Sequence, residues 1–142
     1  MPRRTGQVAV WCLLALIPLL MAMGIGESEG PVRIPEPQTN YRVLLTDQEG
    51  SRVELTHFSI EGQSFVLGKM GKGEAAVPLE QVKEVELTNQ GDMLKAKLLL
   101  AKGGPVELKV KPSLVATGKT SFGNYRISLK EVTRIQVLGR SQ

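Results

Sequence analysis

The sequence predicts an all-β fold of two tandem five-stranded small-barrel-like repeats packed together, after an N-terminal signal segment. First, the stretch 118–138 is echoed fifty positions earlier, without a gap, at 68–87. Second, apolar and polar residues alternate with the two-residue period of strands in many segments after residue 41. Third, aromatic residues are scarce, so the core must rest on Val, Leu and Ile, which favour strands.

The echo indicates an internal duplication, with repeat 1 over 41–88 and repeat 2 over 93–138. We expect Gly73 and Gly123 to occupy equivalent turns with positive φ, which glycine tolerates best. The identical pairs are Gly68/Gly118, Lys69/Lys119, Gly73/Gly123, Leu79/Leu129 and Val82/Val132.

Residues 1–24 have the three parts of a secretory signal peptide. Arg3 and Arg4 precede an apolar run over 8–23, and Ala22-Met23-Gly24 suits signal peptidase, so we expect cleavage before Ile25. The alternative is an uncleaved membrane anchor, although the run is short for a span of about 20 residues. We therefore predict an exported protein, periplasmic or extracellular, or else one anchored at its N-terminus and facing outside.

Residues 25–40 are polar and rich in proline, which predicts an extended tether. The one cysteine, Cys12, lies inside the signal segment. The mature chain then has no thiol, which excludes disulfides, thiolate catalysis and cysteine metal sites.

Repeat 1 begins with a predicted hairpin, formed by strand-like runs at 42–46 and 52–56 around a turn with Asp47 and Gly50. Further strands are expected over 64–70, 75–79 and 83–88. The change of apolar spacing at 79–82 predicts one turn of 3₁₀ helix before the last strand.

Repeat 2 has the same order of elements. Its strands are expected over 94–101, 106–111, 114–120, 125–129 and 133–138, with a short turn before the last.

The V-P-L-E-Q-V and I-S-L-K-E-V segments, within 76–87 and 126–138, resemble those that feed the closing strand of small barrels of the Src-homology, Sm-like and photosynthetic-reaction-centre types. The resemblance implies a small barrel of about 45 residues per unit. Peptide-binding members line a groove with aromatics that are too few here, and an exported chain does not meet RNA. A unit this small has too little core to stand alone, so the two should pack, as touching barrels or as one merged β-sandwich.

The sequence lacks the parts of common catalytic and metal sites, so we predict no enzyme activity, no catalytic residues, no cofactor and no metal. Gly118-Lys119-Thr120 resembles the end of a phosphate loop, but Ser113 stands at the first glycine position and a strand follows. His57 is the only histidine, and we interpret it as a surface or strand-end residue.

One loop tip combines rings and cations. Lys119, Phe122, Tyr125 and Arg126 surround the S-F-G-N turn of repeat 2, and we name them as the candidate partner-binding residues. The alternative is that Tyr125 belongs to the core and that the two cations are solvated.

Charge is distributed unevenly along the chain. Residues 25–94 hold six basic and twelve acidic residues, a net charge of −6, whereas 95–142 hold ten basic and two acidic, a net charge of +8. Opposite fields would favour docking of the two repeats and leave a basic face for anionic polymers. Alternatively, both charge sets solvate outward strand faces.

These observations favour an exported non-enzymatic β-module that binds a partner protein or an anionic envelope component. The alternatives are a structural or assembly subunit that uses its sheet edges, and a membrane-anchored accessory domain. We expect no nucleic-acid partner, membrane contact only through an uncleaved N-terminal segment, and possible self-association.

Overall fold

The computed structural model describes residues 34–141, and this part of the chain is all-β, as predicted. The predicted signal peptide and the first part of the tether lie outside the described residues. The strands are β1 (Tyr41–Asp47), β2 (Arg52–Ile60), β3 (Phe65–Met70), β4 (Gly73–Pro78), β5 (Val82–Gln90), β6 (Met93–Leu100), β7 (Val106–Val110), β8 (Val115–Lys119), β9 (Asn124–Ser128) and β10 (Val132–Arg140). Two 3₁₀ turns, η1 (Leu79–Gln81) and η2 (Leu129–Glu131), precede β5 and β10, so each predicted repeat holds five strands with a helical turn before the last.

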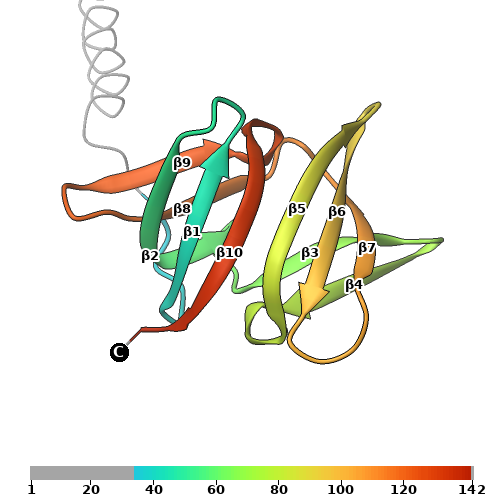
Figure 1. Cartoon of the computed structure of the whole chain (residues 1–142), viewed down its shortest axis with the longest axis horizontal. Coiled ribbons are helices and arrows are strands. Elements are labelled where there is room, and N and C mark those ends of the chain that lie inside the picture. The colour runs from blue at the N-terminus through green and yellow to red at the C-terminus, as the bar shows by residue number, and fades with distance from the viewer. Residues whose placement is uncertain (1–33, 142) are drawn as a thin grey trace, which may run out of the picture. The chain divides into compact units, whose positions relative to one another are not determined.

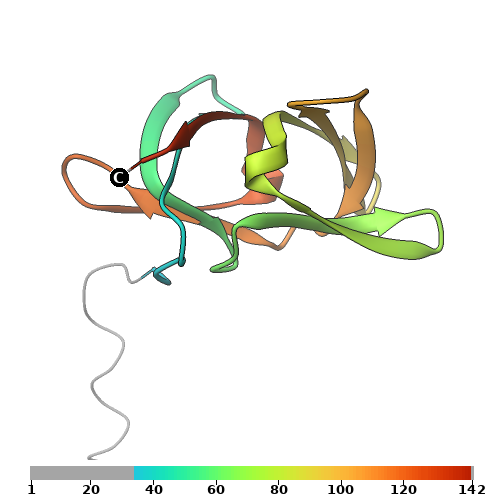
Figure 2. The same ribbon diagram turned by 90° about the horizontal axis from the view of Figure 1, so that it is seen from below.

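The ten strands form one antiparallel sheet in the order β4-β3-β7-β6-β5-β10-β1-β2-β8-β9. Strands β3 to β7 are continuous in sequence and make up one half of this order, which we call the continuous half-sheet. The other half, the split half-sheet, joins β1 and β2 of repeat 1 to β8, β9 and β10 of repeat 2. Each half-sheet curls on itself (Figures 1 and 2), consistent with the small-barrel resemblance.

The two repeats therefore exchange strands. Strand β2 pairs with β8 rather than with β3, and β7 pairs with β3 rather than with β8. In each half-sheet, two strands from one repeat complete the three strands and the 3₁₀ turn of the other. The strand pairing between repeats could not be predicted from the sequence pattern, which indicated only the duplication.

A pseudo-twofold axis passes between β5 and β10. These strands pair with Val85 opposite Ile135, flanked by Glu84 opposite Gln136 and Glu86 opposite Arg134. Val85 and Ile135 are fifty residues apart, which is the offset of the duplication. The axis therefore relates η1 to η2 and β4 to β9, and the core residues Leu79, Val82 and Val85 to Leu129, Val132 and Ile135, all buried.

Glycine is needed where strands from different repeats cross. A Cβ atom on Gly118 would lie 2.8 Å from Cβ of Leu55 and 3.1 Å from the carbonyl oxygen of Thr56. A Cβ atom on the equivalent Gly68 would lie 2.8 Å from the carbonyl oxygen of Lys109. The repeated glycines thus permit the close approach of β8 to β2 and of β3 to β7.

The predicted glycine turns are only partly correct. Gly123 has a φ of 156°, but Gly73 is not in the positive-φ region, and Gly71, with a φ of 64°, takes that role in the first repeat. The reason is that Gly73 pairs with Met70 as part of β4, which leaves a two-residue turn over 71–72.

The exchange also redistributes charge. The ranges 41–60 and 115–140 of the split half-sheet contain seven basic and four acidic residues, a net charge of +3. The range 65–110 of the continuous half-sheet contains seven basic and six acidic residues, a net charge of +1. The opposite charges of the two sequence halves therefore do not become opposite fields on the two half-sheets.

We predict that Gly118→Ala lowers the free energy of unfolding by roughly 1–3 kcal/mol, because its methyl group would overpack the β2–β8 crossing. Chemical denaturation measures this effect. Gly104→Ala is the control, since no atom lies within 4 Å of the Cβ position there. Equal stability of the two variants would contradict the close approach of β8 to β2 at Gly118.

We further predict a pH effect from Glu84, whose side chain is 17% exposed beside Arg134 on β10. Burial, followed by a hydrogen bond with Glu86, raises the pKa of Glu84 above 4.5. The folded state then binds this proton more tightly than the unfolded chain, so the contribution of Glu84 to stability falls as pH rises above about 4.5.

Thermal unfolding of the wild type and Glu84→Gln between pH 4 and pH 7 tests this prediction. The wild type should lose stability relative to the variant as pH rises. A control, Glu74→Gln on β4, removes the same charge from an exposed site. If the stability of the wild type relative to Glu84→Gln instead grew with pH, the charge of Arg134 would affect the pKa of Glu84 more than burial does.

Candidate partner-binding site on the β8–β9 hairpin

The β8–β9 hairpin presents an aromatic side chain on a closed loop. Phe122 is 85% exposed at its tip. The hydroxyl oxygen of Thr120 accepts hydrogen bonds from the N–H groups of Phe122 (3.1 Å) and Gly123 (3.0 Å), and the hydroxyl donates to the carbonyl of Gly123 (2.8 Å). These local bonds hold the backbone of the four-residue loop, which places Phe122 at its tip.

The other three predicted site residues have different environments. Lys119 forms an ion pair of 3.1 Å with Glu36 of the tether. Tyr125 packs partly buried against the core, and its burial, followed by the charge of Asp47, raises the pKa of its phenol. Arg126 is exposed on β9. Tyr125 thus belongs to the core, as the alternative interpretation held, and Phe122 and Arg126 remain available to a partner.

The described part of the tether lies against this same half-sheet. Pro35 lies close to Gly62, at 3.2 Å from the place of a Cβ atom there. It also lines, with Arg126, a hollow of about 320 Å³. Asn40 accepts a hydrogen bond of 2.7 Å from the N–H of His57 through its side chain, and another of 2.7 Å from the N–H of Ser141 through its backbone carbonyl.

Strand β9 is one of the two edges of the sheet. Two hydrogen bonds, from Thr120 N–H to Gly123 C=O (2.7 Å) and from Leu129 N–H to Leu114 C=O (2.8 Å), determine which facing residues of the hairpin form hydrogen-bonded pairs. Because antiparallel pairs alternate, Tyr125 and Ile127 direct their backbone groups toward β8, and Arg126 and Ser128 direct theirs to the open edge. Those groups can accept an added strand.

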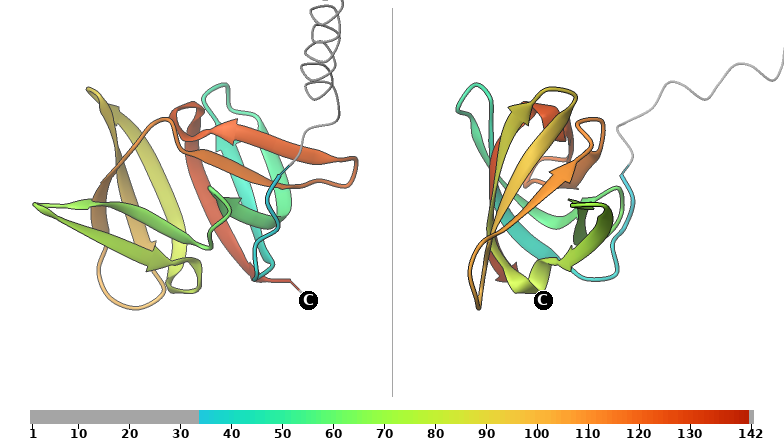
Figure 3. Two further views of the ribbon diagram at one scale, coloured as in Figure 1. Left: turned by 180° about the vertical axis from the view of Figure 1, so that it is seen from behind. Right: turned by 90° about the vertical axis from the view of Figure 1, so that its right-hand side faces the viewer.

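The other edge, β4, is partly blocked by a proline. The hydrogen bond from Leu79 N–H to Ser64 C=O (3.0 Å) gives the β3–β4 hairpin the equivalent hydrogen-bonded pairs, so the backbone groups of Ala76 and Pro78 face the open edge. Pro78 has no N–H to offer, and proline is a common guard of sheet edges. Its equivalent on β9 is Ser128, which keeps this donor. Figure 3 shows the two hairpins extending at opposite ends of the sheet.

Sequence reasoning missed the surroundings of His57. This residue lies in the middle of β2, half-buried, with a φ of 52°, rather than at the surface or a strand end. Its Nδ1 is 3.1 Å from the Thr56 hydroxyl. The chain bulges at the point where β2 stops pairing with β1 and begins to pair with β8. The sequence could not predict this bulge, because it depends on which strands pair.

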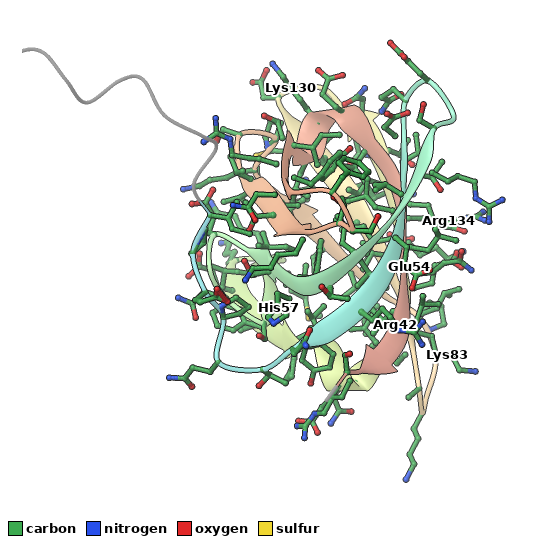
Figure 4. The ribbon with its side chains drawn as sticks, turned by 90° about the vertical axis from the view of Figure 1, so that its left-hand side faces the viewer. Arg42, Glu54, His57, Lys83, Lys130 and Arg134 are labelled. Atoms are coloured by element: carbon green, nitrogen blue, oxygen red, sulfur yellow. The ribbon has the colours of Figure 1, made fainter. Side chains whose placement is uncertain are left out.

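The outer face of β5, β10, β1 and β2 carries ion pairs that join neighbouring strands. Arg42 meets Glu54 at 3.1 Å, and Arg134 meets Glu84 at 3.5 Å and Glu86 at 3.8 Å. Arg42, Glu54, Lys83 and Arg134 project on this side in Figure 4. Over residues 34–141, no group of three or more His, Cys, Asp or Glu residues could hold a metal ion.

Comparison with known proteins gives a family. A family model described as "Uncharacterised protein" matches residues 37–140. A protein of Aquifex aeolicus (strain VF5), described as "Uncharacterized protein", is 32% identical over 106 residues, which cover 74% of this chain and 80% of the relative. No solved structure matches. Among the described residues, no helix is long and apolar enough to cross a membrane. The chain therefore belongs to this family, and the matched region contains the whole ten-stranded sheet.

Proposed function

We propose that this protein is an exported, non-enzymatic module that binds a partner protein at the β9 edge, by adding an extended segment of the partner to the sheet. The observation that carries the proposal is the difference between the two edges, since β9 keeps its outward donors where β4 has Pro78. Strand addition supplies affinity through main-chain hydrogen bonds, and side-chain contacts supply specificity.

The neighbouring side chains suit this role. Phe122 offers a large apolar contact beside the edge, and its loop is ordered before binding, which lowers the entropic cost of association. Arg126 adds a cation on β9 itself. An acidic or aromatic side chain on the partner would complement this pair.

An assembly role uses the same edge. Two copies could pair their β9 strands antiparallel and continue the sheet across a twofold axis. This second function predicts association that depends on protein concentration and needs no other protein.

Export is the first part of the proposal to test. Mass spectrometry of the protein recovered from a fractionated native host should show a product that starts at Ile25 in the periplasmic or extracellular fraction. Recovery of the intact chain in membranes would support the anchored alternative, and recovery in the cytoplasm would contradict export.

The edge itself is tested with Arg126→Pro, which removes an outward N–H without removing a bond to β8. A photo-crosslinking amino acid at position 122 should form an adduct with one protein in the host envelope, and Arg126→Pro should abolish that adduct. Ala76→Pro makes the equivalent change on β4 and should leave it intact. Arg126→Ala separates loss of the side chain from loss of the N–H.

The identity of the adduct decides between the two functions. A crosslink to a different protein supports the module, and a crosslink to a second copy supports assembly. An adduct that survives Arg126→Pro would contradict strand addition. The same probe at Lys72, the equivalent hairpin tip, reports non-specific labelling.

A further inference from the structure

Three lysines stand side by side on the outer face of the continuous half-sheet. Lys109 on β7 pairs with Lys69 on β3 and with Lys95 on β6. Residues paired in this way project to the same face, with strands about 4.8 Å apart, so the three side chains span about 10 Å. Like charges placed directly opposite each other destabilise a sheet, so this row opposes folding.

The charges of this row are incompletely balanced. Lys95 meets Glu107 at 3.8 Å. Glu74 is the cross-strand neighbour of Lys69 on β4. Within residues 34–141, however, neither Lys69 nor Lys109 has a carboxylate within ion-pair distance.

The equivalent row in the split half-sheet is balanced. Lys119, the equivalent of Lys69, is paired with Glu36, and Arg42, the equivalent of Lys95, is paired with Glu54. Thr56 stands where the other row has Lys109, and it faces Lys119. The next row of the continuous half-sheet also alternates in sign, with Glu107 opposite Lys97 and Lys97 opposite Glu86. The all-lysine row is therefore a local exception to the charge pattern of the sheet.

The lysine row borders a hollow. Lys69, Lys95 and Lys109 line a depression of about 760 Å³, together with Gln90 and Met93 of the β5–β6 hairpin and with Met70 and Gly71 of the β3–β4 hairpin. This volume is in the range of small-molecule sites. Glu107, the ion-pair partner of Lys95, also lines it, so the site is a concave surface with three ammonium groups, the carboxylate of Glu107 and the amide of Gln90.

We propose that this hollow binds a soluble chain of phosphate groups. Lysine ammonium groups act as point charges with three donors each, which suits successive phosphate oxygens and does not impose the planar geometry that arginine gives to carboxylates. Three of them in a row match a linear oligoanion better than a single ion. This site is separate from the β9 edge and does not depend on the proposed partner.

The geometry favours a soluble ligand over a membrane surface. The lysines lie between two hairpins whose turns carry Lys72 and Asp92, so the two tips together present no net positive charge to an anionic bilayer. Among the described residues, the large apolar side chains exposed on β3 are Leu67 (42%) and Met70 (49%), and two such side chains are a small apolar surface for insertion into a bilayer. A flat lipid surface would meet the hairpin tips before it reached the lysine row.

Titration calorimetry of the purified exported protein with tripolyphosphate tests the site. Lys69→Gln and Lys109→Gln should each weaken binding roughly tenfold. Lys119→Gln is the matched control, because it removes the same charge at the equivalent of Lys69, and it should weaken binding less than twofold. Lys109→Gln should also raise the unfolding temperature by relieving repulsion, which shows that weaker binding is not unfolding.

Equal weakening by all three variants, or no binding of tripolyphosphate at low salt, would overturn the proposal, since only net charge would then be at work. Vesicles containing phosphatidylglycerol form a second arm. Binding to vesicles that needs Lys69 and Lys109, without binding of tripolyphosphate, would overturn the soluble ligand in favour of a membrane. Inorganic phosphate should bind much more weakly than the chain.

Discussion

The pairing of β5 with β10 is the interaction on which the rest of the structure depends. It is the one ladder that joins the two half-sheets directly, and it places Val85 opposite Ile135 at the pseudo-twofold axis. Because those residues are buried, slipping one strand by one position against the other would turn the apolar side chains of the shifted strand toward solvent. Opposite charges at the flanking positions, Arg134 with Glu84 and Glu86, reinforce the same register.

Strand exchange explains how two units that are each too small for a stable core form one domain. Buried residues of both repeats make up a single apolar cluster, so neither repeat can keep its core without strands of the other. Symmetry also gives each surface feature a partner that can be compared with it. The edges differ at Pro78 and Ser128, and the outer rows differ at Lys109 and Thr56. We expect functional residues at positions where the two repeats differ, because the requirements of core packing are the same for both repeats.

Much of the fold could be predicted from local patterns. Alternation of apolar residues indicated the strands, and the change of spacing at Leu79 and Leu129 indicated both 3₁₀ turns. The exchange could not be predicted, because β2 has the same inward residues whether it pairs with β3 or with β8. Of the candidate site, the sequence already offered Tyr125 as a core residue, and the structure places Phe122 exposed at the loop tip. The ion pair of Lys119 with Glu36 could not be predicted, because it depends on a contact between distant segments. The lysine row could not be predicted from the sequence either, since Lys69, Lys95 and Lys109 meet only across strands.

Cross-strand nuclear Overhauser effects in isotope-labelled protein test the exchange most directly. We predict contacts between the backbones of Ser59 and Thr117 and of Val85 and Ile135, because these residues face each other in the β2–β8 and β5–β10 ladders. The buried hydroxyls of Ser59 and Thr117, 3.0 Å apart, should exchange slowly with solvent. A ladder between β2 and β3, with no contact between Ser59 and Thr117, would show that each repeat folds on its own strands and would contradict the account.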